Sequence, residues 1–366
     1  MYRRSAITVS AGLGLLVLLA LVSRAPVARS LPAGSGDPSH PSSREPIPLP
    51  EPPDVKQRGV ALGLFAEDIS FSYAPLIREI AALGATHVSL VVPLYQTDVA
   101  SNQLRLHTRF SPTLETIADA IRLSRRAGLE VTLFPIVRLC RAASPKEWRG
   151  TLAPANRDAW FASYGALLSD LASLGALTGA SRLAVGSELS SLDSDLSRWR
   201  PVVQRTRALF PGTLLYSANW DHYRDARLFE LVDEIGVVAY FGLRDQDGPS
   251  DVASLSARWR SLRREIEHDL NGYAKPFVLS ELGYRSRTGS TAAPWDEAAG
   301  GVPDAGEQMR GFQAFRQAWT APTQGKSSLA GLYVWNWYGY GGPETTSYTP
   351  RGKPAVDVIR QILDEL

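Results

Sequence analysis

Short apolar runs alternate with longer amphipathic stretches along residues 59–366, and few folds accommodate such a pattern. The runs are rich in Val, Leu and aromatic residues, which is typical of buried strands, whereas the stretches have apolar residues at helical spacing. Strands are predicted at 59–65, 86–92, 130–137, 182–186, 213–217, 234–240, 276–281 and 330–337. Helices are predicted at 73–83, 113–127, 157–177, 195–210, 225–231, 251–270, 304–319 and 354–366.

Strands that are apolar on both faces, and that each return through a helix, form a parallel sheet. Eight such units favour closure into a (β/α)8 barrel over an open, doubly wound sheet. The predicted fold class is therefore α/β, with a TIM barrel as its architecture. In such a barrel the residues just after each strand meet at one face, so polar side chains there are the candidates for function.

The N-terminal region differs in composition from the rest of the chain. Arg3 and Arg4 precede an apolar segment at residues 5–22, which is the arrangement of an export signal. Because these 18 residues reach the lower limit for crossing a bilayer, residues 1–25 are predicted to be a cleaved signal peptide or a retained membrane anchor. Residues 26–57 are rich in Pro and Ser and predict a disordered linker before a folded domain at 58–366. The protein is expected to be exported, as a periplasmic, secreted or membrane-anchored chain.

Charge and cysteine content exclude several classes of function. A formal net charge of +2 gives no field that would collect nucleic acid, so a neutral substrate fits better. Cys140 is the only cysteine, which excludes an intrachain disulfide and a cysteine zinc cluster. The five histidines form no HExxH pair, and no Gly-x-Ser-x-Gly motif occurs. We therefore expect no metal, no cofactor and no nucleic acid, and we expect a monomer.

Two glutamates follow apolar runs in matched contexts. Glu188 stands at the end of the run at 182–186, and Glu281 at the end of the run at 276–281. Three strand and helix units separate them, which puts both on facing sides of the barrel mouth. Hydrolysis of a glycosidic bond needs one carboxyl that donates a proton and a second that attacks or activates water. Each glutamate alone could equally be a solvated charge or the partner of a nearby Arg, but the matched contexts favour the catalytic interpretation.

Polar and aromatic side chains follow other predicted strands and suit a sugar, which has hydroxyl edges and an apolar face. The candidates for sugar contacts are Gln96, Asn219, Trp220, Tyr240 and Trp335. Tyr240 is expected either to donate to a catalytic carboxylate or only to satisfy a buried carbonyl. Strand alternation sends Trp335 and Trp337 to opposite sides, and we expect Trp335 to face the cleft and Trp337 to face the helices.

Several segments of the chain are similar to the strand motifs of one known family. They are GSEL at 186–189, LYSANW at 215–220, VVAYF at 237–241, SELGYRS at 280–286, YVWNW at 333–337, GKPA at 352–355 and WRG at 148–150. Together they resemble glycoside hydrolase family 113, over residues 59–366. The resemblance implies a retaining (β/α)8 glycosidase related to endo-β-1,4-mannanases, with Glu188 as acid/base, Glu281 as nucleophile and Trp148 near the substrate. As the acid, Glu188 is expected to have the higher pKa of the pair in the ligand-free protein.

Two positions depart from the pattern of this family and its wider clan. The clan commonly has Asn before the acid/base, where this chain has Ser187. Around Pro135 the family is usually more polar, whereas Phe134 and Ile136 flank this position here and leave Arg138 as the nearest polar group. Both departures touch the expected sugar-binding floor. Ser187 and Arg138 are therefore candidate substrate contacts, and the departures bear on which sugar is bound more than on the reaction.

The carboxyl pair and the resemblance predict retaining hydrolysis of a β-linked polysaccharide. Mannan is the first expected substrate, and glucan, xylan or an exopolysaccharide are the alternatives. A non-catalytic carbohydrate-binding protein is the alternative from another class, because a fold alone does not establish catalysis. An activity screen against a panel of β-glycans separates these classes.

Removal of the N-terminal region tests the predicted domain boundary. A chain that begins near Arg58 is expected to be soluble, monodisperse and as active as the full chain, because the linker lacks the apolar residues needed to pack. Size-exclusion chromatography and a comparison of specific activities check this expectation. Aggregation or loss of activity on removal of residues 1–55 would show that the linker takes part in the fold.

Overall fold

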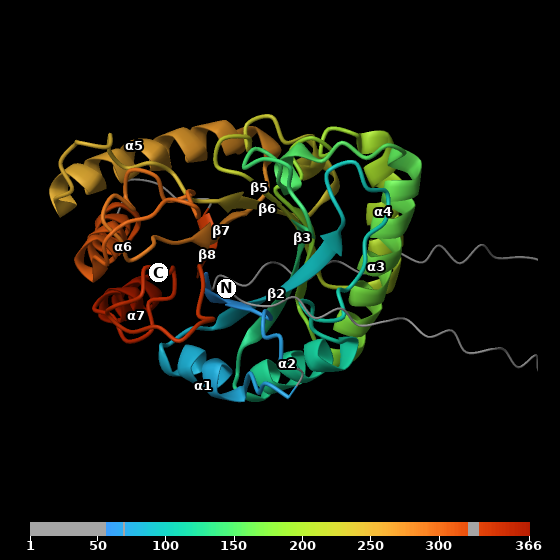
Figure 1. Ribbon diagram of the computed structural model, residues 1–366, viewed down its shortest axis with the longest axis horizontal. Coiled ribbons are helices and arrows are strands. Elements are labelled where there is room, and N and C mark those ends of the chain that lie inside the picture. Colours follow the sequence, from blue (N-terminus) through green and yellow to red (C-terminus); the bar gives the residue numbers. More distant parts are fainter. Residues whose placement is uncertain (1–55, 69, 321–328) are drawn as a thin grey trace, which may run out of the picture. The chain divides into compact units, whose positions relative to one another are not determined.

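The computed structural model describes residues 56–68, 70–320 and 329–366 and confirms the predicted barrel. Eight parallel strands pair in chain order, and β1 pairs with β8 to close the sheet (Figure 1). The strands are β1 (Gln57–Gly63), β2 (His87–Gln96), β3 (Glu130–Leu139), β4 (Arg182–Ser187), β5 (Thr213–Ala218), β6 (Glu234–Val238), β7 (Phe277–Leu282) and β8 (Leu329–Val334). Because all eight run in one direction, their carboxyl ends meet at a single mouth.

The helices surround the strands (Figure 1). They are α1 (Ala74–Ala82), α2 (Leu114–Arg126), α3 (Arg157–Thr178), α4 (Leu196–Leu209), α5 (Val252–Leu270), α6 (Ala305–Trp319) and α7 (Ala355–Glu365). The described residues also form short 3-10 helices, namely η1 (Arg149–Thr151), η2 (Arg227–Leu231) and η3 (Asn271–Tyr273). The helix starts follow from local sequence, since Thr113, Asn156, Asp251 and Asp304 each accept a capping hydrogen bond from a backbone N–H.

The helix predicted at 225–231 is wrong in type, because only the 3-10 helix η2 forms there. The first part of the connection between β5 and β6 is a series of turns, in which the backbone N–H groups of His222 and Tyr223 both bond to the Asn219 carbonyl. The few residues left before β6 would form too few hydrogen bonds to offset the cost of α-helix nucleation. Short segments of this kind commonly adopt 3-10 geometry.

Strands β6 and β8 end earlier than predicted. β6 stops at Val238 and β8 stops at Val334, before Tyr240 and Trp337. The register of β7 shifts against both of its neighbours in this region. The regular ladder therefore ends where the candidate site begins, and the backbone beyond it is free to turn side chains toward the mouth.

The folded domain begins slightly before the predicted start at Arg58. Gln57 is already part of β1 and is buried. Its side chain donates to Glu234 Oε1 at 2.5 Å and accepts from Tyr333 Oη at 2.8 Å. These bonds join β1 to β6 and β8 inside the barrel, so a truncated chain needs to retain Gln57.

The predicted signal or anchor at residues 1–25 lies outside the described residues, as does nearly all of the predicted linker. Among the helices of the part that the structure describes, none is long and apolar enough to cross a bilayer. Export and membrane anchoring therefore stay predictions.

Two apolar clusters support the mouth. The larger cluster joins the strands to the surrounding helices and contains the fully buried rings of Trp160, Trp199 and Trp259. The smaller cluster includes Phe134 and Ile136 of β3 and extends up to the rings of Tyr240, Trp335 and Tyr348. The two apolar side chains around Pro135 are therefore part of the floor beneath the mouth, as the sequence predicts.

Trp335 and Trp337 lie on opposite sides of the chain that follows β8. Trp337 belongs to the larger cluster, and its Nε1 donates to Glu79 Oε2 of α1 at 2.7 Å. Trp335 belongs to the smaller cluster and borders a cavity at the mouth. The centroids of the Trp335 and Phe65 rings are 6.5 Å apart. This is the orientation that strand alternation predicts.

Replacement of Trp337 by Ala is expected to lower the free energy of unfolding by about 3 to 5 kcal/mol, because it removes a buried ring and leaves Glu79 without that donor. Urea titration followed by circular dichroism measures this change. Trp335→Ala is the matched control and should destabilise the protein less, since its ring already borders a cavity. A larger loss in the Trp335 variant would contradict the assigned orientation of the two rings.

Candidate active site

Glu188 is the first residue after β4 and has an unusual backbone conformation. Its φ is 53°, in the left-handed region that residues other than Gly rarely adopt. Two bonds to β5 hold this turn: Glu188 N–H donates to the Ser217 carbonyl at 2.7 Å, and Leu189 N–H donates to Tyr216 Oη at 3.1 Å. The side chain is directed inward and is almost completely buried. Strain of this kind is concentrated at functional sites in proteins.

Arg149 binds the Glu188 carboxylate. Its Nε donates to Glu188 Oε2 at 2.7 Å, and its Nη2 contacts the same oxygen. The guanidinium carbon of Arg149 also lies 5.8 Å from the centre of the Trp148 ring. A Cβ on Gly150 would lie 2.3 Å from that ring, so only glycine allows Trp148 to fold back here. The WRG segment thus places the Arg149 guanidinium at the mouth. Trp148 packs against Arg149 and does not line the cavity that Arg149 borders.

Glu281 lies in β7 and is the more deeply buried of the two carboxyls, with 1% of its surface exposed. Tyr240 Oη donates to Glu281 Oε2 at 3.0 Å, which is the first of the two roles expected for Tyr240. The other oxygen, Oε1, is buried and has no hydrogen-bond partner in the described part of the chain. A buried acceptor without a donor is costly for folding, so this oxygen is a candidate for a chemical role.

The two carboxyls differ in how their surroundings stabilise charge. Burial and, after it, the negative charge of Glu188 raise the pKa of Glu281 to about 8. Burial also raises the pKa of Glu188, but the Arg149 guanidinium opposes this change. Arg149 therefore favours the ionised form of Glu188, whereas burial and the nearby charge of Glu188 favour the protonated form of Glu281. The ion pair with Arg149 opposes the protonated form of Glu188 that the acid role requires.

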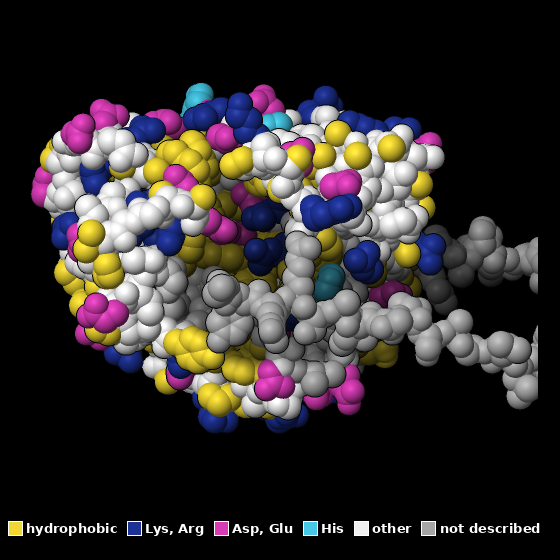
Figure 2. Space-filling model, viewed as in Figure 1, with side chains coloured by type: hydrophobic (Ala, Val, Ile, Leu, Met, Phe, Trp, Pro, Cys, Tyr) yellow, Lys and Arg dark blue, Asp and Glu magenta, His cyan; other side chains and the backbone are white. Residues whose placement is uncertain are grey.

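A cavity of about 320 Å³ lies next to the carboxyl pair, because its wall includes Arg149, which binds Glu188, and Tyr348, which packs on Tyr240. Its walls include Arg138, Arg149, Arg285, Glu297, Trp335 and Tyr348. Figure 2 shows a hollow near the centre of this face in which hydrophobic, basic and acidic side chains meet, the same mixture that lines the cavity. An apolar wall with a few charged groups suits a sugar, because each ring has both an apolar face and polar edges.

Besides Arg149, three of these cavity residues were not identified as site residues from the sequence. Arg285 is held by the carbonyls of Thr346, Glu297 and Ala299. Tyr348 lies 5.6 Å from the Tyr240 ring and comes from the segment before α7. Glu297 lies in an irregular loop, where its charge raises the pKa of both catalytic candidates. Among these three, only Arg285 had a signal in the sequence, since it lies within the SELGYRS segment at 280–286.

The structure places most of the expected sugar contacts around the mouth. Trp335 and Arg138 line the cavity, and Ser187, next to Glu188, has a buried hydroxyl without a partner among the described residues. Asn219 donates to Asp221 Oδ1 at 2.8 Å and is mostly buried. Trp220 lines a neighbouring cavity instead.

Gln96 is not placed to contact a sugar, which corrects the prediction for this residue. Its side chain is fully buried, and its amide nitrogen donates to the Asp98 carbonyl at 2.7 Å. Its amide oxygen accepts from Trp160 Nε1 at 2.9 Å. The amide therefore connects β2 to α3, because the indole of Trp160 reaches it from the helix layer.

Comparison with known proteins gives the same fold. The profile of Glycoside Hydrolase Family 113 matches residues 71–348. The GH113 β-mannanase AaManA from Alicyclobacillus acidocaldarius in complex with ManMIm is 24% identical, with a TM-score of 0.74 over 85% of this chain and 97% of that chain. A GH113 β-1,4-mannanase is 20% identical, with a TM-score of 0.74 over 85% of this chain and 99% of that chain. A β-D-glucuronidase of Dictyoglomus thermophilum is 14% identical, with a TM-score of 0.59 over 85% of this chain and 51% of that chain. No curated protein matches the chain.

The family match spans most of the barrel, including β4, β7 and β8. The solved relatives share the closed eight-stranded architecture described above. The chain therefore belongs to glycoside hydrolase family 113 and is a glycoside hydrolase with a (β/α)8 barrel.

Proposed function

We propose that the protein cleaves a β-linked polysaccharide with retention of configuration, that β-1,4-mannan is its first candidate substrate, and that Glu281 and Glu188 perform the reaction. The observation that carries this proposal is the pair of buried carboxyls at the ends of β4 and β7, close enough for the charge of one to raise the pKa of the other. A retaining glycosidase requires two such groups about 5 to 5.5 Å apart.

Glu281 is the proposed nucleophile. Tyr240 orients its carboxylate through Oε2, which leaves Oε1 without a donor and available to attack the anomeric carbon. Attack requires the ionised form, so the proton that Glu281 holds in the ligand-free pair has to leave before the reaction.

Glu188 is the proposed acid and base. In the first step it gives a proton to the leaving oxygen as Glu281 bonds to the anomeric carbon and the glycosidic bond breaks. In the second step it takes a proton from water as the water oxygen bonds to the anomeric carbon and the bond to Glu281 breaks. Its ion pair with Arg149 favours the ionised form, so a bound sugar has to weaken that contact before Glu188 can act as the acid. Transfer of the single proton from Glu281 to Glu188 satisfies both requirements.

Trp335 is the proposed platform beneath the sugar, because its ring borders the cavity. The free hydroxyl of Ser187 and the guanidinium of Arg138 are the proposed polar contacts. Mannan is supported by the solved relatives, which are β-mannanases. Export of the protein would place it where such a polymer occurs. Another β-glycan or exopolysaccharide is the alternative substrate, and a non-catalytic glycan-binding protein is the alternative function.

Azide rescue tests the two assigned roles. In Glu188→Ala, hydrolysis of polymer should fall by about 10²- to 10⁴-fold, but an activated aryl β-mannoside needs little acid assistance. Glu281 should still form the glycosyl-enzyme in this variant, and azide should convert it to the β-glycosyl azide. In Glu281→Ala, azide should attack the substrate directly and give the α-glycosyl azide. Nuclear magnetic resonance of the products identifies the anomer.

Glu344→Ala is the control for these variants, since Glu344 is exposed and should behave as the wild type. Exchange of the two azide anomers would exchange the two roles. Inverted product from the unmodified protein would exclude the covalent mechanism. Unimpaired turnover in both alanine variants would exclude the pair as the catalytic groups.

Replacement of Arg149 by Met tests the electrostatic part of the proposal. Arg149 lowers the pKa of both carboxyls, so its loss should raise both values. The acidic and basic limbs of the kcat/KM profile should then move to higher pH, by about 1 to 3 pH units. Arg109→Met, which removes an exposed arginine paired with Glu67, should leave the profile unchanged. Limbs that stay in place, or that move to lower pH, would contradict the assigned influence of Arg149.

A further inference from the structure

We propose that a second cavity, beside the catalytic one, binds another unit of the same sugar chain and that Trp295 is its platform. This inference rests on the proposed function and adds a second binding position for the polymer. The cavity has a volume of about 610 Å³ and lies between the loops that follow β5, β6 and β7. Its walls include Trp220, Phe241, Asp245, Gln246 and Trp295. A cavity of this size is within the range of small-molecule sites.

Two tryptophans form the apolar wall of this second cavity. The rings of Trp220 and Trp295 stack with centroids 4.7 Å apart and planes 28° apart. Trp295 is nevertheless 43% exposed. An indole that is held in place by a neighbour but remains open to solvent offers a flat apolar surface, which is the surface that the apolar face of a sugar ring covers.

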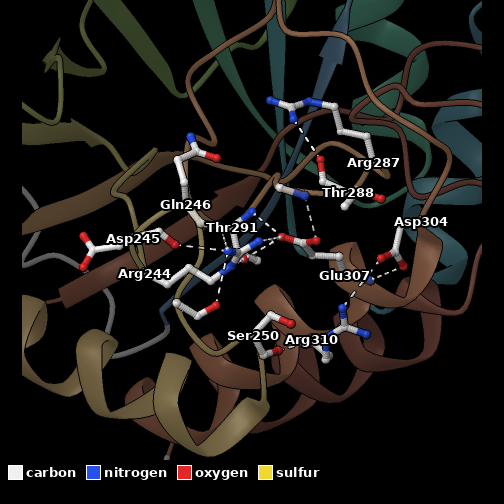
Figure 3. Close-up of polar contacts among 12 residues, drawn as sticks. Arg244, Asp245, Gln246, Ser250, Arg287, Thr288, Thr291, Asp304, Glu307 and Arg310 are labelled. Atoms are coloured by element: carbon white, nitrogen blue, oxygen red, sulfur yellow. Dashed lines mark hydrogen bonds and ion pairs between the residues drawn. The ribbon is translucent and has the colours of Figure 1, made fainter.

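Polar groups stand at the edge of the same cavity. Asp245 and Gln246 are exposed, and no hydrogen bond of the described residues uses their side-chain ends. Figure 3 shows these ends pointing away from Arg244, which instead contacts the two backbone carbonyls. A carboxylate and an amide beside an aromatic ring are the groups that hydroxyl edges of a sugar require.

A buried ion pair holds the walls of the cavity in place. Arg244 lies in the loop between β6 and α5 and contacts Glu307 Oε1 at 3.1 Å, with both side chains at least nine-tenths buried. Arg244 Nε donates to Thr291 Oγ1 at 2.9 Å, and Glu307 accepts from the Thr291 and Gly289 backbone N–H groups. Figure 3 shows this network joining the two loops. The loop that carries Trp295 is thereby fixed against the loop that carries Asp245, so little ordering is needed when a ligand binds.

The second cavity is adjacent to the catalytic cavity. Tyr348, which lines the catalytic cavity, donates from Oη to the Pro294 carbonyl, one residue before Trp295. Glu297, two residues after Trp295, lines the catalytic cavity. The segment 294–297 therefore forms a shared wall, with Trp295 on one side and Glu297 on the other. A sugar chain that leaves the catalytic cavity over this wall reaches Trp295 next.

This arrangement makes the rate of cleavage depend on the length of the substrate. A monosaccharide with an aryl leaving group occupies only the catalytic cavity, whereas an oligosaccharide can also cover Trp295. Binding at a remote ring accelerates cleavage only for substrates long enough to reach it. The second cavity therefore favours cleavage of substrates that are long enough to cover Trp295.

Two measurements on the full chain test this proposal. The first compares kcat/KM for β-1,4-mannohexaose and for an aryl β-mannoside. Trp295→Ala should lose about tenfold or more on the hexasaccharide and stay unchanged on the aryl mannoside. Trp295→Phe keeps a ring and should recover most of the loss. Tyr340→Ala removes a fully exposed aromatic ring that lines neither cavity and should match the wild type on both substrates.

The second measurement is affinity electrophoresis in native gels that contain soluble β-1,4-mannan, β-glucan or xylan. At least one polymer should retard the wild type and Tyr340→Ala, and should retard Trp295→Ala less. Equal retardation of the wild type and Trp295→Ala, or no retardation by any polymer, would overturn the proposal. Cleavage that does not depend on Trp295 would refute the second cavity while leaving the hydrolase proposal intact. Retardation that depends on Trp295 without any cleavage would support the cavity and refute the hydrolase proposal.

Discussion

The pairing of β1 with β8 closes the sheet, and the position of every candidate functional group depends on that closure. In an open sheet, β4 and β7 would lie about 14 Å apart, with their side chains on a nearly flat surface. Closure curves the sheet so that strand ends three positions apart face each other across one mouth. Glu188 and Glu281 interact electrostatically for this reason, although many residues separate them in the chain.

Burial of these carboxyls has a cost that the surrounding residues only partly offset. Arg149 stabilises the charge on Glu188, and Tyr240 donates to one oxygen of Glu281, while the other oxygen has no partner among the described residues. A fold selected only for stability would pair or expose these groups. The site therefore holds two carboxyls whose ionisation a bound substrate can change. The same low-dielectric surroundings that raise the pKa of both carboxyls also strengthen any interaction with charge that develops during bond cleavage.

Features with a local cause were predictable from the sequence, and features that depend on distant contacts were not. Trp335 and Trp337 were assigned to opposite sides because strand alternation is a local rule, and the structure has that orientation. Gln96 also follows a strand, yet its amide is bonded to Trp160 of α3, which no local pattern indicates. Trp295 was missed because it lies in an irregular loop, where no periodicity marks a residue for the surface or for a cavity.

The sequence by itself determined the eight strands, most of the helices and the two glutamates at strand ends, because hydrophobic periodicity and capping residues act over a few neighbouring positions. Tertiary structure alone decided which groups those glutamates contact and how their surroundings favour or oppose a charge on each of them. Arg149 reaches Glu188 only after the segment behind β3 folds over the mouth, and the pKa of Glu281 rises only once other elements exclude water from it. Charge stabilisation depends on distance and desolvation in three dimensions, and neither quantity is encoded in the spacing of residues along the chain.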